Sequence, residues 1–551
     1  MTRLGVQVGK LCVLAGCAVA CRLAWAEASL EARFAEPPES SRLQAWWHWC
    51  GDNVTEKGIA ADLAAMREMD VGTAHVFSPA MMGPIPGYHV KLLTDEWKRL
   101  FAFAVAEAKK NGVRLGFHNC PGWSSSGGPW IRPEDSMKVV VCSSVDVKAG
   151  ADKVRVPQPE AKHGFYRDIA LVAFPVADEP ARVRVTGDFR DDFAAFAAGK
   201  QPVRLPLSRG KASPAAVTLE YAAPFRPSTL SVQFADSRAV LTGVVEASAD
   251  GKSWRQLRTF GFHFHADIGD AKYLAVDCPQ PSRFFRVTFR PGDIPEWMGG
   301  KPFDTRLKAL ALTAVPMVPD LGLRNASTVA IGYRPAANPD QPGVAKSAFV
   351  DLTPHQNGDE VDLKACRAKL FNSSTRQPVN FRILRIGYTT SGKTCAPATL
   401  PGLECDKLSK RGLDAHWPHL PHELLSAPGA AGTVRVGIID SFEVGGQNWT
   451  GILPQEFAKR RGYPLGKHLV SVCGYSLGTT GDTLKFLWDW QKTIGELIAE
   501  NYYGRFTELC HENGIKSILE PYGGPFDTHQ CAGYADVPTG EFWLGASSHS
   551  S

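Results

Sequence analysis

Apolar and polar positions follow two different patterns along the chain, and the first pattern covers residues 42–119. Short apolar runs typical of buried strands alternate there with runs in which apolar residues recur at the spacing of one helix face. Thr94 is the predicted N-cap and Gly112 the predicted C-terminal cap of the second helix. Such alternation predicts a parallel sheet, either open or closed into a barrel. The predicted strands are 46–50, 72–77 and 113–119, and the predicted helices are 55–70 and 94–112.

The second pattern runs from about residue 135 to residue 430 and consists of short alternating strands between turns rich in Gly, Pro and Asp. This pattern predicts β-sandwich structure. Residues 215–292 resemble a discoidin-like carbohydrate-binding sandwich in two short segments, EASADGKSWRQL and RFFRVTF. The first pattern then resumes, so we expect one α/β domain, built from residues 27–134 and 431–551, with a β-rich insertion at 135–430. The predicted later elements are strands 433–442 and 515–523 and helices 454–462 and 482–513.

The N-terminal 26 residues have the pattern of an export signal. Cations near the start precede an apolar run, and Ala24-Trp25-Ala26 matches a cleavage site. Arg22 interrupts the apolar run, so we expect no membrane span after the signal is removed. The predicted location is periplasmic or extracellular. Anchoring as a lipoprotein through Cys17 is the alternative.

Composition excludes some classes of function. Hydrophobic residues make up 44% and charged residues 21% of 551 residues, as in a soluble globular protein. The net charge of +5 comes without a long Lys/Arg run, so nucleic acid is not an expected partner. The 13 cysteines include no CxxC pair, which disfavours zinc. Cys395 and Cys405 enclose a short loop, but their pairing cannot be inferred from the sequence.

The segment GYTTSGKT (387–394) matches the phosphate-loop pattern GxxxxGK[ST]. That motif binds phosphate only when its last residues open a helix. Pro397 and Pro401 occupy the first two turns of the helix that would be required. We therefore expect no nucleotide to bind here.

The segment HNCPGWSSSGGPW (118–130) begins where a predicted strand ends, which is where barrel enzymes build ligand sites. Trp123 and Trp130 are candidates to stack on sugar faces. His118 and Asn119 are candidates to hydrogen-bond hydroxyl groups or, through oxygen, to contact a cation. The alternative interpretation is a Gly-rich turn whose aromatic side chains pack into the core.

Carboxylates form the third candidate set. Glu443 and Glu520 each come just beyond the apolar run of a predicted strand, and Glu541 comes later in the segment PTGEFW. Glycoside hydrolysis uses two carboxyl groups, and the neighbouring Trp449 and Trp543 are candidates for stacking on the sugar. The alternative interpretation is that these are solvated loop charges.

Long motifs stand in a fixed order along the chain, and together they resemble glycoside hydrolase family 106. They are WWHWCGDNVTEKGIAADLAAM, HNCPGWSSSGGPW, RIGYTTSGKT with GLECDKL, DSFEVGGQNWT, FLWDWQKTIGELIAENYYG and EPYGGPFDTHQCAGYADVPTGEFW. The resemblance implies a TIM-type (β/α)8 barrel with β-sandwich additions and an inverting α-L-rhamnosidase acting on rhamnose-bearing polysaccharides or glycosides. It also implies that a calcium ion (Ca2+) assists substrate binding.

Carried onto this sequence, the resemblance implies that Glu443 and Glu541 are the catalytic pair. Glu443 is expected to be the general acid and Glu541 the general base, and the opposite assignment stays open. His118, Asn119 and Glu520 are then expected substrate or cation contacts, and Asn119 is the one named calcium candidate.

The chain ends eight residues after Trp543, whereas family members continue for several hundred residues. From this we expect an incomplete barrel of about five to six strands. Two alternative functions stay open at this point. One is a non-catalytic carbohydrate-binding protein, and the other is an inactive truncated fragment of the enzyme.

Overall fold

The structure is a computed structural model that describes most of the chain. The N-terminal segment with its predicted export signal, and Trp543, lie outside the described residues. No helix among the described residues is long and apolar enough to cross a membrane. The described residues are 30–35, 38, 41–123, 126–148, 150–176, 178–207, 214–235, 240–262, 272–292, 304–329, 340–364 and 380–541.

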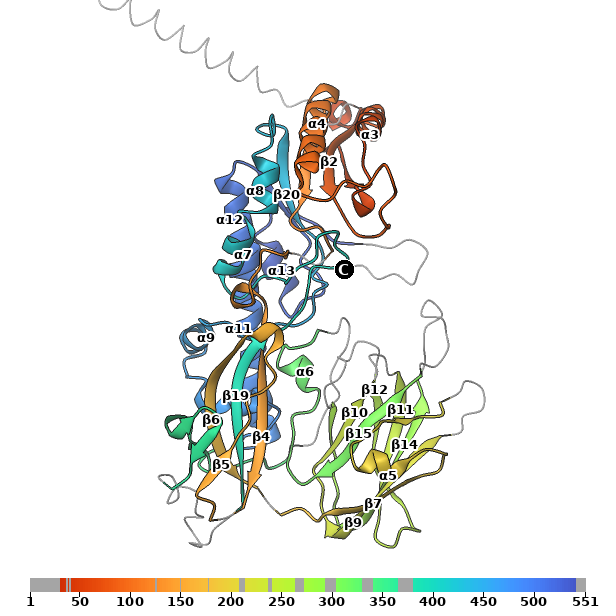
Figure 1. Ribbon diagram of the computed structural model, residues 1–551, viewed down its shortest axis with the longest axis vertical. Coiled ribbons are helices and arrows are strands. Elements are labelled where there is room, and N and C mark those ends of the chain that lie inside the picture. The colour runs from red at the N-terminus through yellow and green to blue at the C-terminus, as the bar shows by residue number, and fades with distance from the viewer. Residues whose placement is uncertain are drawn as a thin grey trace, which may run out of the picture.

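The α/β part is built on one parallel sheet (Figure 1). Its strands pair in chain order, β1-β2-β3-β20-β21-β22, and every pair is parallel. Strands β3 and β20 are neighbours although the β-rich segment separates them in sequence, which agrees with the predicted interruption. The strands are β1 (Leu43–His48), β2 (Val71–Phe77), β3 (Arg114–His118), β20 (Val434–Ile439), β21 (Lys516–Leu519) and β22 (Val537–Pro538).

The helices of this part begin and end close to the predicted positions. In α4 the Thr94 side chain accepts a hydrogen bond from the Trp97 amide, and Gly112 ends the helix with φ of 69°. Both predicted caps are therefore confirmed. The predicted long helical region is continuous, with a π-helix (Ala499–Gly504) between α11 and α12. The helices are α2 (Leu30–Ala35), α3 (Glu56–Glu68), α4 (Asp95–Asn111), α7 (Lys410–His416), α8 (Leu420–Leu425), α9 (Leu453–Arg461), α10 (Leu469–Val472), α11 (Thr480–Ile498), α12 (Arg505–Glu512) and α13 (Thr528–Ala532).

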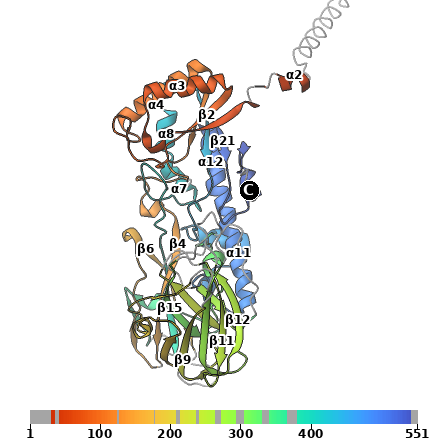
Figure 2. The same cartoon turned by 90° about the vertical axis from the view of Figure 1, so that its right-hand side faces the viewer.

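Between β3 and β20 the chain forms two β units that lie side by side below the parallel sheet (Figures 1 and 2). The first unit has a sheet in the order β16-β6-β19-β4 and a small sheet β17-β18-β5. Its main strands are β4 (Lys138–Val147), β6 (Tyr166–Pro175), β16 (Val350–Asp351) and β19 (Phe381–Thr390). The short ones are β5 (Lys153–Arg155), β17 (Gln356–Asn357) and β18 (Glu360–Asp362).

The second β unit has two facing sheets, β12-β11-β14-β9-β7 and β13-β10-β15-β8, around its own apolar core. The discoidin-like stretch at 215–292 supplies most of its strands. The short helix α5 (Phe193–Ala197) packs on β7, whereas α6 (Leu321–Arg324), which follows β15, packs on α11. Its strands are β7 (Arg182–Gly187), β8 (Val203–Arg204), β9 (Ala215–Phe225), β10 (Thr229–Phe234), β11 (Leu241–Ser248), β12 (Arg255–Phe262), β13 (Lys272–Ala275), β14 (Ser282–Pro291) and β15 (Arg306–Thr313).

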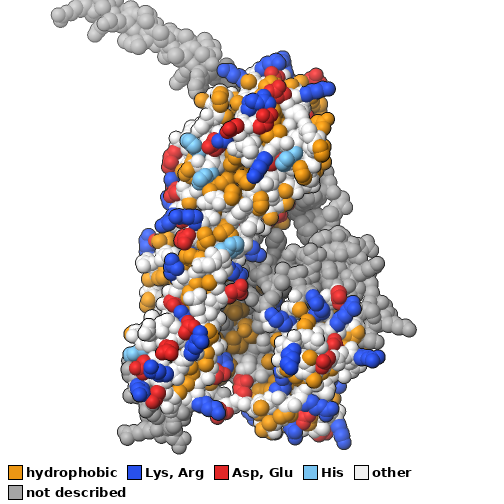
Figure 3. Space-filling model, viewed as in Figure 1, with side chains coloured by type: hydrophobic (Ala, Val, Ile, Leu, Met, Phe, Trp, Pro, Cys, Tyr) orange, Lys and Arg blue, Asp and Glu red, His pale blue; other side chains and the backbone are white. Residues whose placement is uncertain are grey.

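The phosphate-loop pattern lies on a strand and the loop after it. GYTT ends β19, which pairs antiparallel with β4 and β6. In the described segment from Ser391 to Ser409 no helix forms, and the next helix is α7. The expectation that no helix opens at this motif is therefore confirmed. On the face of the molecule in Figure 3, basic and acidic side chains are interspersed over the α/β part and both β units.

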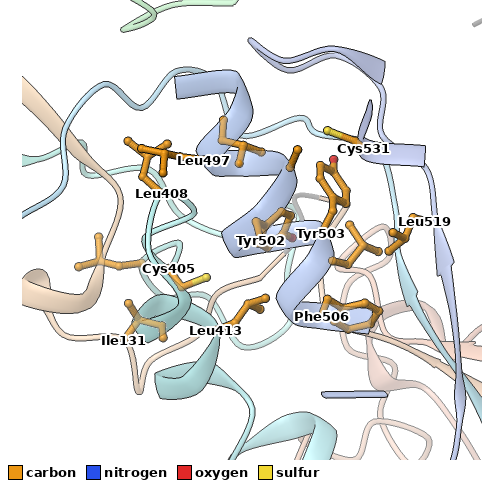
Figure 4. Close-up of a cluster of buried hydrophobic side chains, with 14 of the residues drawn as sticks. Ile131, Cys405, Leu408, Leu413, Leu497, Tyr502, Tyr503, Phe506, Leu519 and Cys531 are labelled. Atoms are coloured by element: carbon orange, nitrogen blue, oxygen red, sulfur yellow. The ribbon is translucent and has the colours of Figure 1, made fainter. Parts of the chain in front are cut away.

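The largest core joins the parallel sheet to the first β unit through α11 and α12. Figure 4 shows the region around the π-helix, where Tyr502 and Tyr503 enter a cluster with Leu413, Phe506 and Leu519. Both tyrosines are fully buried. Burial of this apolar surface, at about 25 cal/mol per Å² removed from water, is what holds the helices against the sheet.

A buried ion pair lies behind this cluster. Lys407 Nζ donates to Glu404 Oε2 at 2.5 Å, and both side chains are 0% exposed. The same carboxylate oxygen accepts the Ser126 amide, and the ammonium group lies over the rings of Phe442 and Tyr502. The pair therefore connects the loop after β3, the loop after β19, the loop after β20 and the π-helix.

We expect Lys407→Met to lower the free energy of unfolding by about 3–5 kcal/mol, because it leaves the Glu404 carboxylate buried without its counter-charge. The matched control is Lys410→Met. Lys410 pairs with Glu508 on the surface, where both side chains are 48% exposed, so its loss is expected to cost less than about 1 kcal/mol. Urea unfolding followed by tryptophan fluorescence measures both. Equal losses in the two variants would contradict a structural role for the buried pair.

Candidate active site

Polar and aromatic side chains gather at the carboxyl ends of the parallel strands. Because neighbouring parallel strands end at the same edge of a sheet, residues that follow different strands meet there. The chain places His48 at the end of β1, Phe77 at the end of β2, His118 at the end of β3, Asp440 after β20, Glu520 after β21 and Glu541 after β22.

Backbone hydrogen bonds continue the sheet beyond the ends of β20 and β21. The Glu520 amide donates to the Ile439 carbonyl at 3.0 Å, and the Phe442 amide donates to the Tyr522 carbonyl at 2.7 Å. The two loops therefore leave the sheet side by side. This brings Glu443, the residue after Phe442, to the same edge as Glu520.

Asp440 and His118 form the innermost contact of the site. Asp440 Oδ2 lies 3.3 Å from His118 Nε2, and both side chains are buried. The His118 ring stacks on Phe77 with centroids 4.0 Å apart, which fixes its plane. Burial disfavours the charged form of Asp440, but the hydrogen bond and charge of His118 outweigh it and hold the pKa of Asp440 below its usual value.

Glu520 lies in hydrogen-bonding contact with Asp440. Burial, this hydrogen bond and the negative charges of Asp440, Glu541 and Glu443 together raise the pKa of Glu520 to about 9. Two adjacent carboxyl groups cannot both ionise at low cost, so the two titrate as a pair, and the surroundings favour the protonated form of Glu520 over that of Asp440.

Glu443 is exposed, unlike Asp440 and Glu520, which are buried. Partial burial of its carboxyl group, followed by the negative charges of Asp440 and Glu541, raises its pKa, while a hydrogen bond from Ser441 opposes the rise. Glu443 and Glu541 therefore act on one another electrostatically. The fold brings together both carboxylates that the resemblance implies as a pair.

Aromatic rings line the β1 and β2 side of the carboxyl group cluster. Trp123 packs against Phe77 with centroids 4.6 Å apart and meets His48 edge-on at 5.8 Å. Trp46 packs on His118 at 4.8 Å and is 40% exposed. Of the predicted stacking residues, Trp123 is the one that packs against Phe77, the ring that stacks on His118. Trp46 was not among the predicted site residues.

Trp130 and Trp449 were predicted to stack on a sugar, but in the structure both rings pack against other side chains. Trp130 donates its indole N–H to His416 Nδ1 and stacks on His419. Trp449 is 3% exposed and packs between Tyr388 and Trp490. Their ring faces are used in packing, which is the alternative interpretation of these aromatic residues. The predicted role of Trp543 falls outside the described residues.

Asn119 is fully buried, and its side-chain amide donates to Ser126 Oγ. Ser126 Oγ in turn lies 2.8 Å from the Tyr502 hydroxyl, so Asn119 belongs to the network around the buried ion pair. In the described parts of the chain, no group of three or more His, Cys, Asp or Glu side chains is arranged to hold a metal ion. The calcium contact that the family resemblance implies for Asn119 stays a prediction.

Asp440 is the member of the cluster that sequence reasoning missed. The predicted strand extended to residue 442, which placed Asp440 inside a strand, whereas β20 ends at Ile439. Asp440 is therefore the first residue beyond the strand, where ligand-facing groups lie. The Asp-Ser sequence at this point was an available signal, because Asp and Ser are common where strands end.

Paired carboxyl groups beside aromatic rings at the carboxyl edge of a parallel sheet are typical of glycoside hydrolases. A family model described as alpha-L-rhamnosidase, glycoside hydrolase family 106, matches residues 35–551. The chain therefore belongs to glycoside hydrolase family 106, the family of the α-L-rhamnosidases.

Two known proteins resemble most of the chain. A solved rhamnosidase structure from Novosphingobium sp. PP1Y matches with a TM-score of 0.75 and 25% identity over 93% of this chain. A protein of Formosa agariphila described as a putative beta-glucuronidase is 30% identical over 94% of this chain. The chain spans 49% of the rhamnosidase structure and 32% of the Formosa protein.

We expect Glu520→Gln to change how stability depends on pH. The folded-state pKa of Glu520 is about 9 and its ordinary value is 4.5, so its contribution to stability is complete below about pH 4.5 and is lost as the pH rises through about 9. Glutamine cannot ionise. The thermal midpoint of the parent chain should therefore fall relative to that of Glu520→Gln between about pH 5 and pH 9.

The matched control is Glu360→Gln, a substitution at an exposed position on β18, which should follow the parent chain at every pH. If the difference in thermal midpoint between the parent chain and Glu520→Gln stays constant over this range, Glu520 does not hold the proton in the folded state. Scanning fluorimetry in a series of buffers measures all three proteins.

Proposed function

We propose that this chain supplies the catalytic carboxyl groups of an α-L-rhamnosidase that releases terminal rhamnose from polysaccharides or glycosides with inversion of configuration. The observation that carries the proposal is the electrostatic contact among Glu443, Glu541 and Glu520 at the carboxyl edge of the sheet, in a chain of this family. An enzyme of this type needs one carboxyl group that donates a proton and another that accepts one.

Glu443 is the general acid in this mechanism. Its raised pKa keeps a larger fraction protonated near neutral pH, and its exposure allows it to reach the oxygen that links rhamnose to the rest of the substrate. Its proton passes to that oxygen as the glycosidic bond breaks. In an inverting enzyme the partner carboxyl group stands about 6.5–9.5 Å away, which leaves room for the attacking water.

Glu541 is the general base. It accepts a proton from the water molecule that attacks the anomeric carbon on the opposite face of the sugar. Burial of Glu443 and the negative charges of Asp440 and Glu541 maintain its raised pKa. The Trp123 and Trp46 rings on the β1 side offer apolar faces on which the sugar can stack.

The charge of the site supports a neutral sugar. The main groups that shift the pKa values of Asp440, Glu443 and Glu520 are one another, Glu541, His118 and Ser441, and four of these six are carboxyl groups. Rhamnose carries no charge, whereas a glucuronate would bring a carboxylate into this negative site.

The name of the Formosa relative supports a β-glucuronide as the second candidate substrate. One described cation lies beside the loop of Glu443: a Cβ at Gly445 would meet Lys393 Nζ at 3.3 Å. Lys393 is the residue that a glucuronate carboxylate would contact here.

Three further features belong to the proposal. The six-stranded parallel sheet is part of a TIM-type (β/α)8 barrel, the chain is exported through the signal at residues 1–26, and the natural substrate is a rhamnose-bearing polysaccharide or glycoside. A calcium ion that assists substrate binding is also proposed from the family resemblance, and no step of the mechanism passes through it.

We expect Glu443→Gln and Glu541→Gln each to lower the rate of rhamnose release by at least about 100-fold, because each removes one proton transfer from the reaction. Release of p-nitrophenol from p-nitrophenyl α-L-rhamnoside measures the rate, and proton NMR of the first-formed sugar identifies its anomer. Glu360→Gln on β18 is the control that keeps the carboxyl groups of the site intact.

Three outcomes would contradict the proposal. If the folded chain binds rhamnosides and hydrolyses none, the site is a non-catalytic carbohydrate-binding site. If p-nitrophenyl β-D-glucuronide is the preferred substrate and Lys393→Ala abolishes its hydrolysis, the sugar has been assigned wrongly. If the first-formed sugar retains its configuration, one carboxylate is a nucleophile and the inverting mechanism is wrong.

A further inference from the structure

Two cysteines from distant parts of the chain meet where the first β unit packs on the helical segment after α9. Cys142 lies in β4 and is exposed, and Cys473 directly follows α10 and is 8% exposed. The Cys142 thiol lies close enough to the Cys473 thiol to raise the pKa of Cys473, and burial raises that pKa further. The sequence gives no sign of this pair, because the residues are 331 positions apart (473 − 142).

The surrounding contacts fix both cysteines against one another. Cys142, Ser144 and Asp146 stand at alternate positions and so share one face of β4. Asp146 pairs with Arg382 of β19 at 2.6 Å, and Arg382 donates to the Tyr475 hydroxyl at 3.4 Å. Ser144 also hydrogen-bonds that hydroxyl group. Tyr475 comes two residues after the second cysteine, so the segment that carries it is held on the same face as Cys142.

We propose that Cys142 and Cys473 form a disulfide bond that links β4 of the first β unit to the segment between α10 and α11. The bond requires an oxidant, and the class we name is a disulfide donor, such as oxidised glutathione or the active disulfide of a thiol oxidase. Such donors act in the compartments that an export signal leads to.

The chemistry is two successive thiol–disulfide exchanges. The exposed Cys142 thiol loses its proton and attacks the donor disulfide, forming a mixed disulfide and releasing one donor sulfur as a thiol. The Cys473 thiolate then attacks the Cys142 sulfur and releases the second donor sulfur. Two protein thiols are oxidised, one donor disulfide is reduced, and two protons pass to the released thiols. Exposure makes Cys142 the attacking residue and burial makes Cys473 the resolving one.

Other described cysteines are engaged elsewhere. The thiols of Cys120, Cys278 and Cys395 each donate to a nearby backbone carbonyl, those of Gly122, Gln280 and Leu400. Cys395 and Cys405, the pair that encloses a short loop in the sequence, are buried free thiols. Cys142 and Cys473 are free thiols in the structure as well, and they are the pair whose proximity joins two distant segments of the chain.

The bond would support the loop that carries Glu443 without touching the carboxyl groups. Strand β4 begins at Lys138, whose carbonyl accepts the amides of Asn448 and Trp449 from the end of that loop. The Val140 amide also donates to Asn448 Oδ1, at 2.7 Å. A covalent bond at Cys142, two residues further along β4, would hold the strand on which this loop rests.

The test uses the full chain equilibrated with oxidised glutathione, alkylated with iodoacetamide, digested without reduction and analysed by mass spectrometry. We expect one peptide pair that joins Cys142 to Cys473 and disappears on reduction. The thermal midpoint of the oxidised chain should exceed that of the reduced chain by about 5 °C or more, because the bond closes a very long loop of the unfolded chain.

Cys142→Ser should abolish both the linked peptides and the effect of reductant on the thermal midpoint, and its exposed position makes loss of folding improbable as a cause. In that variant Cys473 becomes a thiol that iodoacetamide labels after unfolding. Cys278→Ser, in the second β unit, is the control and should keep the linked peptides. Alkylation of both Cys142 and Cys473 in the oxidised chain, or a bond from either one to a different cysteine, would overturn the proposal. None of these measurements depends on glycosidase activity.

Discussion

The repulsion among carboxyl groups crowded at one edge of the parallel sheet is the constraint on which this site depends. Asp440, Glu443 and Glu541 raise the pKa of Glu520 there, and Asp440 and Glu541 raise that of Glu443. If all four were ionised, the edge would carry an uncompensated negative charge in a partly buried place, which is costly. The fold relieves the repulsion in two ways. It places His118 against Asp440, and it keeps a proton on Glu520.

Such a cluster needs rigid support, because carboxyl groups that repel each other separate unless their loops are held. The loops after β20 and β21 are hydrogen-bonded to each other, as the Phe442 amide and the Tyr522 carbonyl show. Behind them, the buried pair of Glu404 and Lys407 connects four segments in the dry core. A buried ion pair is weak evidence for stability in itself, yet breaking it is expensive, so it fixes the relative positions of what it joins.

The order of elements could be predicted from the sequence, whereas the details of the site could not. The strand and helix patterns gave the parallel sheet, its interruption and the caps of α4, because each depends on local spacing and composition. Whether an aromatic side chain stacks on a substrate or packs into the core depends on residues that are far away in the sequence. Trp449 looked like a stacking residue, but Tyr388 and Trp490 enclose it. Asp440 was hidden by an error of three residues in where a strand ends, within the ordinary uncertainty of such boundaries.

The electrostatics of this edge of the sheet explain how a single fold can keep two carboxyl groups in different protonation states. Glu443 lies nearer the solvent, where its proton can reach a substrate, while Glu520 is buried and holds its proton more tightly. A difference in burial between neighbouring groups separates their pKa values without any change in residue type. Because Glu520 stays neutral, the negative charge felt by Glu443 comes mainly from Asp440 and Glu541. The buried pair of Asp440 and Glu520 therefore influences the pKa of the exposed Glu443. The degree to which each carboxyl group is buried helps to set the order in which the groups ionise.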